Sequence, residues 1–245
     1  MHTSTRVELP EHEAYSVVSG LPDAPIFLTC EHASDRFPAP WGLEGSDIRL
    51  HGTHWSYDLG AREIASELAR TLDATAVLAE FSRLVVDPNR EETSDTLFRD
   101  MADGEPIALN VGLGAEEREA RILRLYRPFH EAVDRALGLC SAPTLLSIHT
   151  FTPLYEGSPR AMEVGVLWNR EDELAERMAL HLERAGFVVA RNEPWSGKDG
   201  LIYSAERHAD RHGRAALELE VRQDRAMDAA FRAWLVPVVA AFFRG

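Results

Sequence analysis

Residues 26–32 have the sequence Ile-Phe-Leu-Thr-Cys-Glu-His. An apolar run that stops at a polar pair predicts a short buried strand with reactive groups at its carboxyl end. Residues 144–149, Thr-Leu-Leu-Ser-Ile-His, repeat the pattern. In open α/β sheets, functional side chains gather beyond the carboxyl ends of the strands. We therefore expect the two terminal histidines, His32 and His149, to meet at one edge of a sheet.

Strands and helices alternate along the rest of the chain. Apolar periodicity predicts helices at 57–72, 114–138, 171–186 and 224–244. Further strands are expected at 75–78, 83–86, 162–168, 187–190 and 217–221. Residues 1–20 look like a polar lead-in, and residues 91–113, which have no clear period, are a candidate lid. The alternation predicts a three-layer α/β/α fold with a mostly parallel or mixed central sheet, in a single domain over residues 1–245.

The net charge of the chain argues against some classes of binding partner. The 245 residues carry a formal net charge of -14 at pH 7, which argues against nucleic acid and anionic membranes as partners. Two cysteines are too few for a disulfide framework, and the sequence shows neither a signal peptide nor the run of about 20 apolar residues that spans a membrane. We expect a cytoplasmic monomer or homodimer. Lys198 is the only lysine among the 26 basic residues, and the many arginines would suit a small acidic substrate, because a guanidinium binds a carboxylate through two hydrogen bonds.

A divalent metal, most simply zinc, is the cofactor that the two histidines indicate. A catalytic zinc site commonly has three protein ligands and one open position. The third ligand would be Asp35, which forms a His-x-x-Asp pair with His32, or Asp58, which follows His54 by one helical turn. The alternative is that each histidine is a structural side chain. Neither a His-Glu-x-x-His nor a Gly-x-Ser-x-Gly motif is present in the sequence.

Glu220 is our candidate general base. It shares one face of the strand 217–221 with Glu218, because residues two apart in a strand point the same way. Hydrolysis at a metal needs a carboxylate that is not itself a ligand. The alternative for Glu220 is an ion pair with Arg222, two residues further on.

The segment Phe-Ser-Arg-Leu-Val-Val-Asp-Pro-Asn-Arg at 81–90 contains two arginines, Arg83 before the apolar run and Arg90 after it. Arg90 follows Asn89 in a loop, where a guanidinium can hold a carboxylate through two hydrogen bonds. Arg83 is a second candidate, and its alternative is a solvated position at a strand edge. His208, four residues before His212, is a candidate for binding substrate or an oxyanion, and its alternative is the polar surface of a helix.

Eight segments in order resemble the N-formylglutamate amidohydrolase family. They are CEHASDRFP at 30–38, HWSYDLGA at 54–61, FSRLVVDPNR at 81–90, YRPFH at 126–130, SIHTFTP at 147–153, VGVLWNR at 164–170, NEPWSG at 192–197 and LEVRQD at 219–224. The resemblance implies a phosphorylase/hydrolase-like fold related to zinc carboxypeptidases. It also implies hydrolysis of an amide on an acidic amino acid, such as N-formyl-L-glutamate giving glutamate and formate.

The resemblance implies His32, Asp58 and His149 as metal ligands and Glu220 as the general base, and Arg83, Asp87, Asn89 and Arg90 match the central motif of the family. Taken with the residues discussed above, the expected catalytic set is Glu220, His208 and Arg222. The expected substrate-binding set is Ser34, Arg83, Asn89, Arg90 and Asn192. Because the chain has Glu-His-Ala-Ser at 31–34 where the best-studied branch has a Pro-His-Ser-Gly-like motif, it is more similar to a sister branch. Three other functions stay open: a deacylase or small peptidase for another N-acyl amino acid, a non-catalytic protein that binds acidic metabolites, and a metal-free hydrolase.

Overall fold

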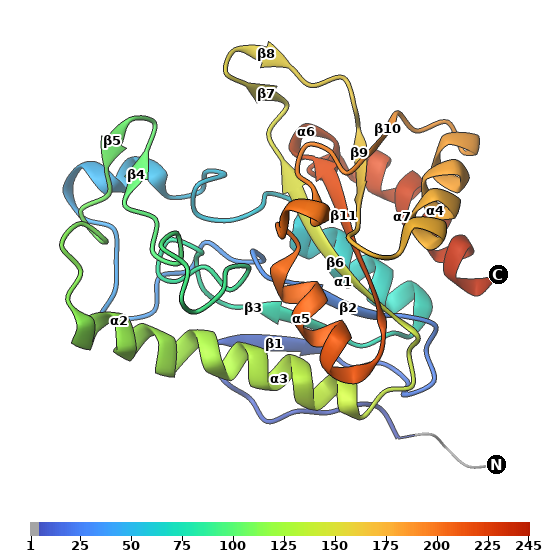
Figure 1. Ribbon diagram of the computed structural model, residues 1–245, viewed down its shortest axis with the longest axis horizontal. Coiled ribbons are helices and arrows are strands. Elements are labelled where there is room, and N and C mark those ends of the chain that lie inside the picture. Colours follow the sequence, from blue (N-terminus) through green and yellow to red (C-terminus); the bar gives the residue numbers. More distant parts are fainter. Residues whose placement is uncertain (1–4) are drawn as a thin grey trace.

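The computed structural model describes residues 5–245 and is built on a seven-stranded mixed sheet (Figure 1). Its order is β1 (Tyr15–Val18), β3 (Ala76–Ala79), β2 (Phe27–Cys30), β6 (Thr144–Phe151), β11 (Ala215–Arg222), β9 (Val164–Leu167) and β10 (Val189–Arg191). Strands β3, β2, β6 and β11 are parallel, and so are β9 and β10, whereas β1–β3 and β11–β9 are antiparallel. This confirms the expected α/β architecture.

Helices cover both faces of the sheet (Figure 1). One apolar core joins the sheet to α1 (Ala61–Leu72), α4 (Asp172–Arg184), α6 (Gln223–Ala226) and α7 (Ala229–Arg244). The other core joins it to α5 (Tyr203–His212) and to one long helix made of α2 (Ala115–Arg121), the π-helical turn η2 (Ile122–Tyr126) and α3 (Arg127–Gly138). The central strand β6 is buried along its whole length, as expected for a strand covered on both faces.

Smaller elements lie outside the sheet. They are the 3-10 turns η1 (Gly45–Leu50) and η3 (Gly197–Asp199), and the hairpins β4 (Met101–Ala102) with β5 (Glu105–Pro106) and β7 (Leu154–Tyr155) with β8 (Ser158–Pro159). The two hairpins stand apart on the same side of the molecule (Figure 1). The long helix is irregular at the π-helical turn η2, directly before Arg127 and Pro128 at the start of α3, and π-helical turns and prolines are common sites of irregularity in helices.

The prediction of a strand at 83–86 is wrong. The segment forms turns, and its apolar side chains are buried in different directions: Leu84 packs in a small cluster with Leu50 and Ile107, whereas Val85 belongs to the large core under α3. The carbonyl of Leu84 accepts a hydrogen bond from the side chain of Asn110 (2.8 Å). Side chains therefore satisfy backbone groups that a neighbouring strand would otherwise pair.

The N-terminal prediction is also wrong in part, because residues 15–18 form the edge strand β1 instead of a polar lead-in. Over residues 5–245, none of the helices has both the length and the apolar character needed to cross a membrane.

Candidate active site

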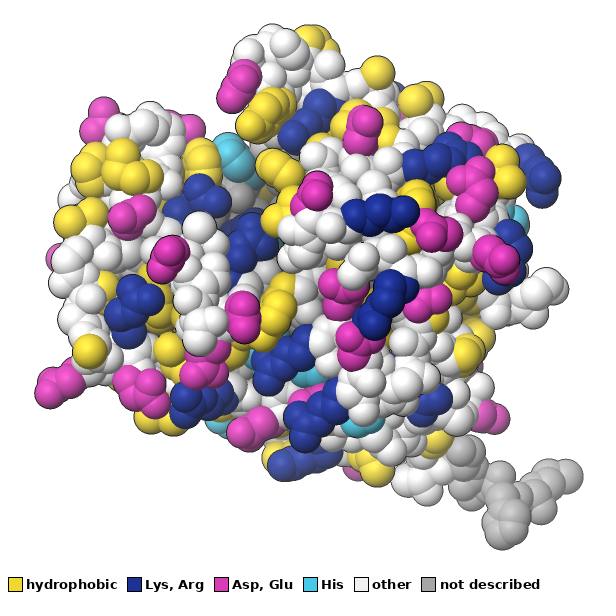
Figure 2. Space-filling model, in the orientation of Figure 1, with side chains coloured by type: hydrophobic (Ala, Val, Ile, Leu, Met, Phe, Trp, Pro, Cys, Tyr) yellow, Lys and Arg dark blue, Asp and Glu magenta, His cyan; other side chains and the backbone are white. Residues whose placement is uncertain are grey.

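A cavity of about 410 Å³ opens beyond the carboxyl ends of β2, β6 and β11. Its floor carries His32 and His149, and its rim includes Trp55 on one side and Tyr155 on the other. The space-filling view shows the hollow between the β4–β5 side of the molecule and the β7–β8 hairpin, with histidine and arginine side chains inside it (Figure 2). The expectation that strand-end side chains meet at one sheet edge is met.

Three buried side chains form a candidate metal centre. His32, Asp58 and His149 each offer one ligand atom, and these atoms lie within 4.8 Å of one another. The Nδ1 atoms of His32 and His149 are 3.4 and 2.8 Å from the same Asp58 oxygen, Oδ2. The backbone N–H of Thr150 donates to this oxygen as well (3.2 Å). Two imidazoles and one carboxylate are a common ligand set for catalytic zinc. The rival ligand Asp35 lies away from this cluster, 3.7 Å from His51.

A second carboxylate lies at the opposite nitrogen of each histidine. The Nε2 atom of His32 is 2.8 Å from Oδ1 of Asp87, and the Nε2 atom of His149 is 3.1 Å from Oε2 of Glu31. The hydroxyl of Ser147 donates to the same Glu31 oxygen (2.5 Å). Carboxylates in this position fix the orientation of metal-binding histidines and raise their basicity. The arrangement leaves both Nδ1 atoms facing Asp58.

The site concentrates negative charge in a buried place. Five carboxylates there are at most 5% exposed: Glu31, Asp58, Asp87, Glu218 and Glu220. One oxygen each of Glu31, Glu218 and Glu220 has no hydrogen-bond partner within residues 5–245. Buried charges need a compensating charge or ligand. The ligand atoms of the candidate metal centre and the negative charge around it therefore both fit a divalent cation.

The pKa values reflect this crowding. Burial raises the pKa of Glu218 to about 7, with the neighbouring carboxylates adding to the effect. Burial, and then the charge of Glu218, raises the pKa of Glu220 well above its usual range. Burial alone would also raise the pKa of Asp58, but the adjacent His32 and His149 outweigh it and hold that pKa low. The carboxylate between the histidines is thus held ionised, as a metal ligand must be.

Glu220 reaches the cavity from the centre of the sheet. It pairs in register with His149 on the neighbouring parallel strand β6 and with Gly165 on β9. A side chain at Gly165 would not fit, because a Cβ atom there would lie 2.2 Å from the carbonyl oxygen of Glu193 and 3.3 Å from Cβ of Glu220. This glycine therefore lets the loop after β10 pass close to the strand that carries Glu220.

Four arginines line the cavity: Arg83, Arg90, Arg99 and Arg160. The guanidinium of Arg83 pairs with Asp87 (2.8 Å) and lies 3.6 Å from Asp58. The cavity thus presents cationic groups as well as the candidate metal centre, although the chain as a whole is acidic. Such a lining favours an anionic ligand.

Asn89 holds the loop that carries Arg90. Its backbone N–H donates to Asp87 (2.9 Å), and its side-chain oxygen accepts from the backbone N–H of Ser204 (3.0 Å). It also lines the cavity. The predicted substrate-binding residues Arg83, Asn89 and Arg90 are therefore all brought to the site.

His208 lies away from the cavity lining. It is fully buried, and its two ring nitrogens are each 2.8 Å from another group, Nδ1 of His130 and Oδ1 of Asp134. With both nitrogens engaged, the ring has no free group to offer a substrate. The sequence could not show this, because the partners come from α3, more than 70 residues earlier.

Three other predicted residues organise backbone near the site. The guanidinium of Arg222 bonds Asp224 and the carbonyls of residues 160–162. The hydroxyl of Ser34 accepts from the backbone N–H of Arg36 (3.1 Å). The side chain of Asn192 accepts from the N–H groups of Trp168 and Gly197. None of these three is part of the cavity lining.

Sequence reasoning missed several groups of the cavity. Arg99, Arg160 and Trp195 lie in segments with no helical or strand period, so no pattern points them at the site. Glu31 and Asp87, which lie beneath the cavity at the outer nitrogens of His149 and His32, received no role in the predicted site. Their signals in the sequence are the strand-end position of Glu31 and the place of Asp87 in the segment 81–90 that resembles the family.

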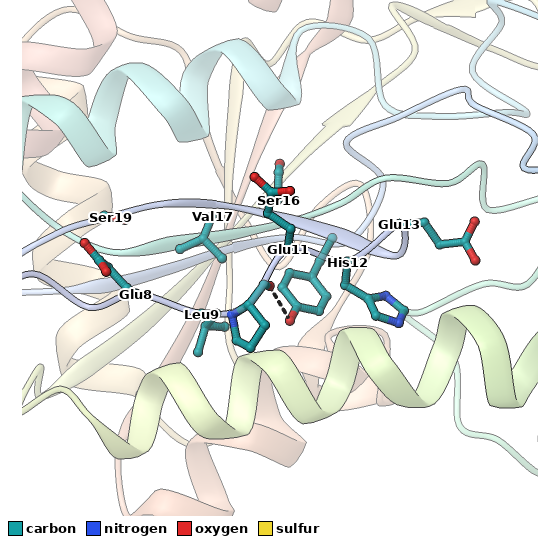
Figure 3. A pocket seen from close by; sticks show the side chains of 10 residues that line it. Glu8, Leu9, Glu11, His12, Glu13, Ser16, Val17 and Ser19 are labelled. Atoms are coloured by element: carbon teal, nitrogen blue, oxygen red, sulfur yellow. Dashed lines mark hydrogen bonds between the residues drawn. The ribbon is translucent and has the colours of Figure 1, made fainter.

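A second hollow of about 680 Å³ lies between the N-terminal segment and β1. Figure 3 shows its lining, in which the hydroxyl of Tyr15 donates to the carbonyl of Pro10 (3.0 Å) and Glu8 and Glu13 point away from each other. None of the predicted site residues lines it. The larger hollow is therefore not the candidate active site.

Comparisons with known proteins bear on the family and the fold of the chain. The model of the N-formylglutamate amidohydrolase family matches residues 24–227. The chain is similar to a structurally characterised gene product of Agrobacterium tumefaciens, with 30% identity, a TM-score of 0.87 and coverage of 95% of this chain and 94% of the other. It shares its fold with the N-formylglutamate amidohydrolase of Ralstonia eutropha JMP134, at 21% identity, a TM-score of 0.75 and coverage of 95% and 97%. A search of curated protein sequences found no significant match.

Proposed function

Because the chain belongs to the N-formylglutamate amidohydrolase family, we propose that it hydrolyses the amide bond of an N-acyl acidic amino acid, with N-formyl-L-glutamate as the first substrate to test. One observation carries the proposal. The cluster of His32, Asp58 and His149 shares a single cavity with the carboxylate of Glu220 and with the guanidinium groups of four arginines. Those are the parts that a hydrolase for an anionic amide needs.

We assign the cluster to one divalent ion, and its ligand types favour zinc. When bound, such an ion polarises a carbonyl group and makes water more acidic. The chain's own contribution is orientation: Asp87 and Glu31 hold the outer nitrogens of His32 and His149. The two rings therefore keep Nδ1 directed at Asp58.

Glu220 moves the proton in this mechanism. Its carboxylate accepts a proton from the attacking water as the new carbon–oxygen bond forms at the amide carbon. It then delivers that proton to the departing nitrogen as the carbon–nitrogen bond breaks, so that formate and the free amino acid result. Its unpartnered oxygen Oε2 and its raised pKa suit a group that both accepts and returns a proton.

Arg83 is placed to stabilise charge on the reacting carbonyl oxygen. Its guanidinium is anchored by Asp87 and lies 3.6 Å from Asp58, so the positive charge is fixed close to the reacting centre. A preorganised donor of this kind does not have to reorient when the negative charge develops. Arg90, on the neighbouring loop, is assigned to a carboxylate of the substrate.

We further propose that the reaction takes place in the cytoplasm and involves a monomer or homodimer. Cys30 and Cys140 are both buried and unpaired, which is usual in a reducing compartment. Light scattering on the purified protein will give its oligomeric state.

The first test is the metal content of the purified protein, paired with formate release from N-formyl-L-glutamate before and after chelation. We expect about one zinc-like ion per chain and formate release that falls on chelation and returns when zinc is restored. Metal without formate release would discard this substrate. Full activity in chelator, or no metal and no gain from zinc, cobalt or manganese, would overturn the metal mechanism.

A further inference from the structure

The proposed reaction assigns no role to Arg160, although it is a charged residue of the cavity. It follows the β7–β8 hairpin and lines the cavity. Its Nη1 atom donates to the carbonyl and the hydroxyl of Thr152, both at 3.2 Å. Its Nε and Nη2 atoms have no hydrogen-bond partner among the described residues 5–245, and no carboxylate there pairs with it. One edge of the guanidinium is therefore free.

Three aromatic rings hold that guanidinium. Its central carbon lies 4.8 Å from the ring centre of Tyr155, 5.4 Å from that of Phe151 and 5.7 Å from that of Trp195. Aromatic faces stabilise the cation while leaving its in-plane N–H groups available. The free edge, Nε with Nη2, is the fork that binds a carboxylate through two parallel hydrogen bonds.

The backbone around Arg160 is fixed as well. Its N–H donates to the carbonyl of Pro153 (2.9 Å), and its carbonyl accepts from the guanidinium of Arg222 (2.9 Å). Arg222 lies two residues after Glu220 on β11. The position of Arg160 is therefore tied to the strand that carries the proposed base.

The depth of Arg160 in the cavity, compared with that of the metal cluster, indicates which part of a substrate it can contact. The metal cluster is at most 4% exposed, whereas Tyr155 and Trp195 beside Arg160 are 50% and 43% exposed. Arg160 is thus at the mouth and the reacting centre at the floor. In an N-acyl acidic amino acid, the α-carboxylate adjoins the scissile nitrogen and stays near the floor, but the side-chain carboxylate extends away from it.

We propose that Arg160 is a specificity-determining residue that binds the side-chain carboxylate of the substrate through its Nε–Nη2 edge. The inference rests on the proposed amide hydrolysis and adds the group that selects acidic over neutral side chains. Arg160 would disfavour a substrate that has a carboxamide in place of the side-chain carboxylate. The N–H₂ group of the carboxamide would then face one N–H of the guanidinium, and two donors cannot form a hydrogen bond. A site built around such a fork discriminates strongly between the two.

The test compares N-formyl-L-glutamate with N-formyl-L-glutamine, which has the same shape and no side-chain charge. In Arg160→Met, kcat/KM for the glutamate substrate should fall about 100-fold, the scale of a lost charged two-point contact. The value for the glutamine substrate should change by less than about threefold. Arg160→Lys should give an intermediate loss, since an ammonium group lacks the fork.

Arg170→Met serves as the matched control. Arg170 forms an exposed pair with Asp210 outside the cavity, so both kcat/KM values should stay at those of the unaltered protein. An equal loss on both substrates in Arg160→Met, or an unchanged preference, would overturn the proposal. The ratio of the two values is insensitive to partial unfolding, which lowers both alike.

A binding experiment separates this inference from the proposed function. Calorimetric titration with glutarate and with its mono-amide needs no hydrolysis. If the unaltered protein releases no formate but prefers glutarate, and Arg160→Met loses that preference, the reaction is wrong and the assignment of Arg160 holds. If formate is released but Arg160→Met keeps the preference for glutarate, the assignment of Arg160 is wrong and the reaction stands.

Discussion

His149 and Glu220 are register partners on the adjacent parallel strands β6 and β11. Register partners on neighbouring strands project from the same face of a sheet. A proposed metal ligand and the proposed base therefore share a geometry set by two central strands, one of which is buried along its whole length. Rigid elements of this kind position reacting groups more precisely than loops do.

Replacing Glu220 by glutamine should slow the chemical step and leave the metal in place. The amide cannot accept a proton, so we expect kcat for formate release to fall by about 10²- to 10⁴-fold. Metal content should not change, because Glu220 is outside the ligand cluster. Steady-state kinetics and elemental analysis on the same preparation measure both. Loss of metal together with activity would instead make Glu220 a ligand, and Glu105→Gln, at an exposed position on β5, is the control.

Asp87→Asn should weaken metal binding although Asp87 is not in the ligand cluster. The carboxylate lies at Nε2 of His32 (2.8 Å), and loss of such an outer partner typically costs 10- to 100-fold in metal affinity. Competition with a zinc chelator measures the shift. Asp35→Asn is the matched control, because Asp35 lies outside the cluster, and its affinity should equal that of the unaltered protein. The reverse order of effects would return the third ligand to Asp35.

Asp134 should make stability depend on pH under acidic conditions. Burial alone would raise its pKa, but hydrogen bonds from His208 and His212 and the charge of Arg211 outweigh burial and lower the pKa to about 2 from an ordinary value of 3.8. A carboxylate with a lowered pKa in the folded state contributes stability above the unfolded value and loses it as the pH falls toward the folded value. The loss should therefore run from about pH 4 to about pH 2.

The measurement for Asp134 is the urea midpoint of unfolding at several pH values in that window. In Asp134→Asn, the midpoint should be lower than that of the unaltered protein near pH 6, and the gap should close as the pH approaches 2. The difference between the two curves removes the contribution of the other carboxylates. A constant gap across the window would show that the charge of Asp134 does not stabilise the fold.

Gly165→Ala should destabilise the fold and lower activity together. The new methyl group would meet the carbonyl oxygen of Glu193 at 2.2 Å, and overpacking of this kind costs about 1–3 kcal/mol. Because Glu220 is also within 3.3 Å, the displacement should reach the proposed base. Gly42→Ala, at a position with open space around it, should change the free energy of unfolding by less than about 0.5 kcal/mol. Urea unfolding of both variants measures the free energy of unfolding, and formate release measures their activity.

The sequence predicted those parts of the fold whose signals are local. Each of the buried strands that ends in a histidine carries its own apolar run and its own polar stop, so the meeting of His32 and His149 followed from sheet geometry. The run Leu84-Val85-Val86 has the same apolar character but forms turns, because residues buried in two different clusters look like one strand when only the order of residues is known.

The candidate site was harder to predict from the sequence than the fold, because its residues come together only in the tertiary structure. Arg160 and Trp195 come from separate loops, and their shared position depends on how those loops fold over the sheet. His208 shows the opposite case. Its spacing to His212 indicates one helix face correctly, but that face turns toward Asp134 on a distant helix and away from the cavity. Helical spacing fixes the direction of a side chain relative to its own helix only.

The β7–β8 hairpin lies between β6 and β9 in the chain and pairs with neither strand. Its insertion or deletion therefore alters no hydrogen bond of the central sheet. In the proposed assignments, the groups for cleavage lie on the central strands, whereas Arg160 and Tyr155, beside the substrate side chain, belong to the hairpin segment. Loops beside a rigid sheet tolerate changes of sequence and length better than the strands themselves do, so we expect changes at the hairpin to leave the positions of His149 and Glu220 unaltered.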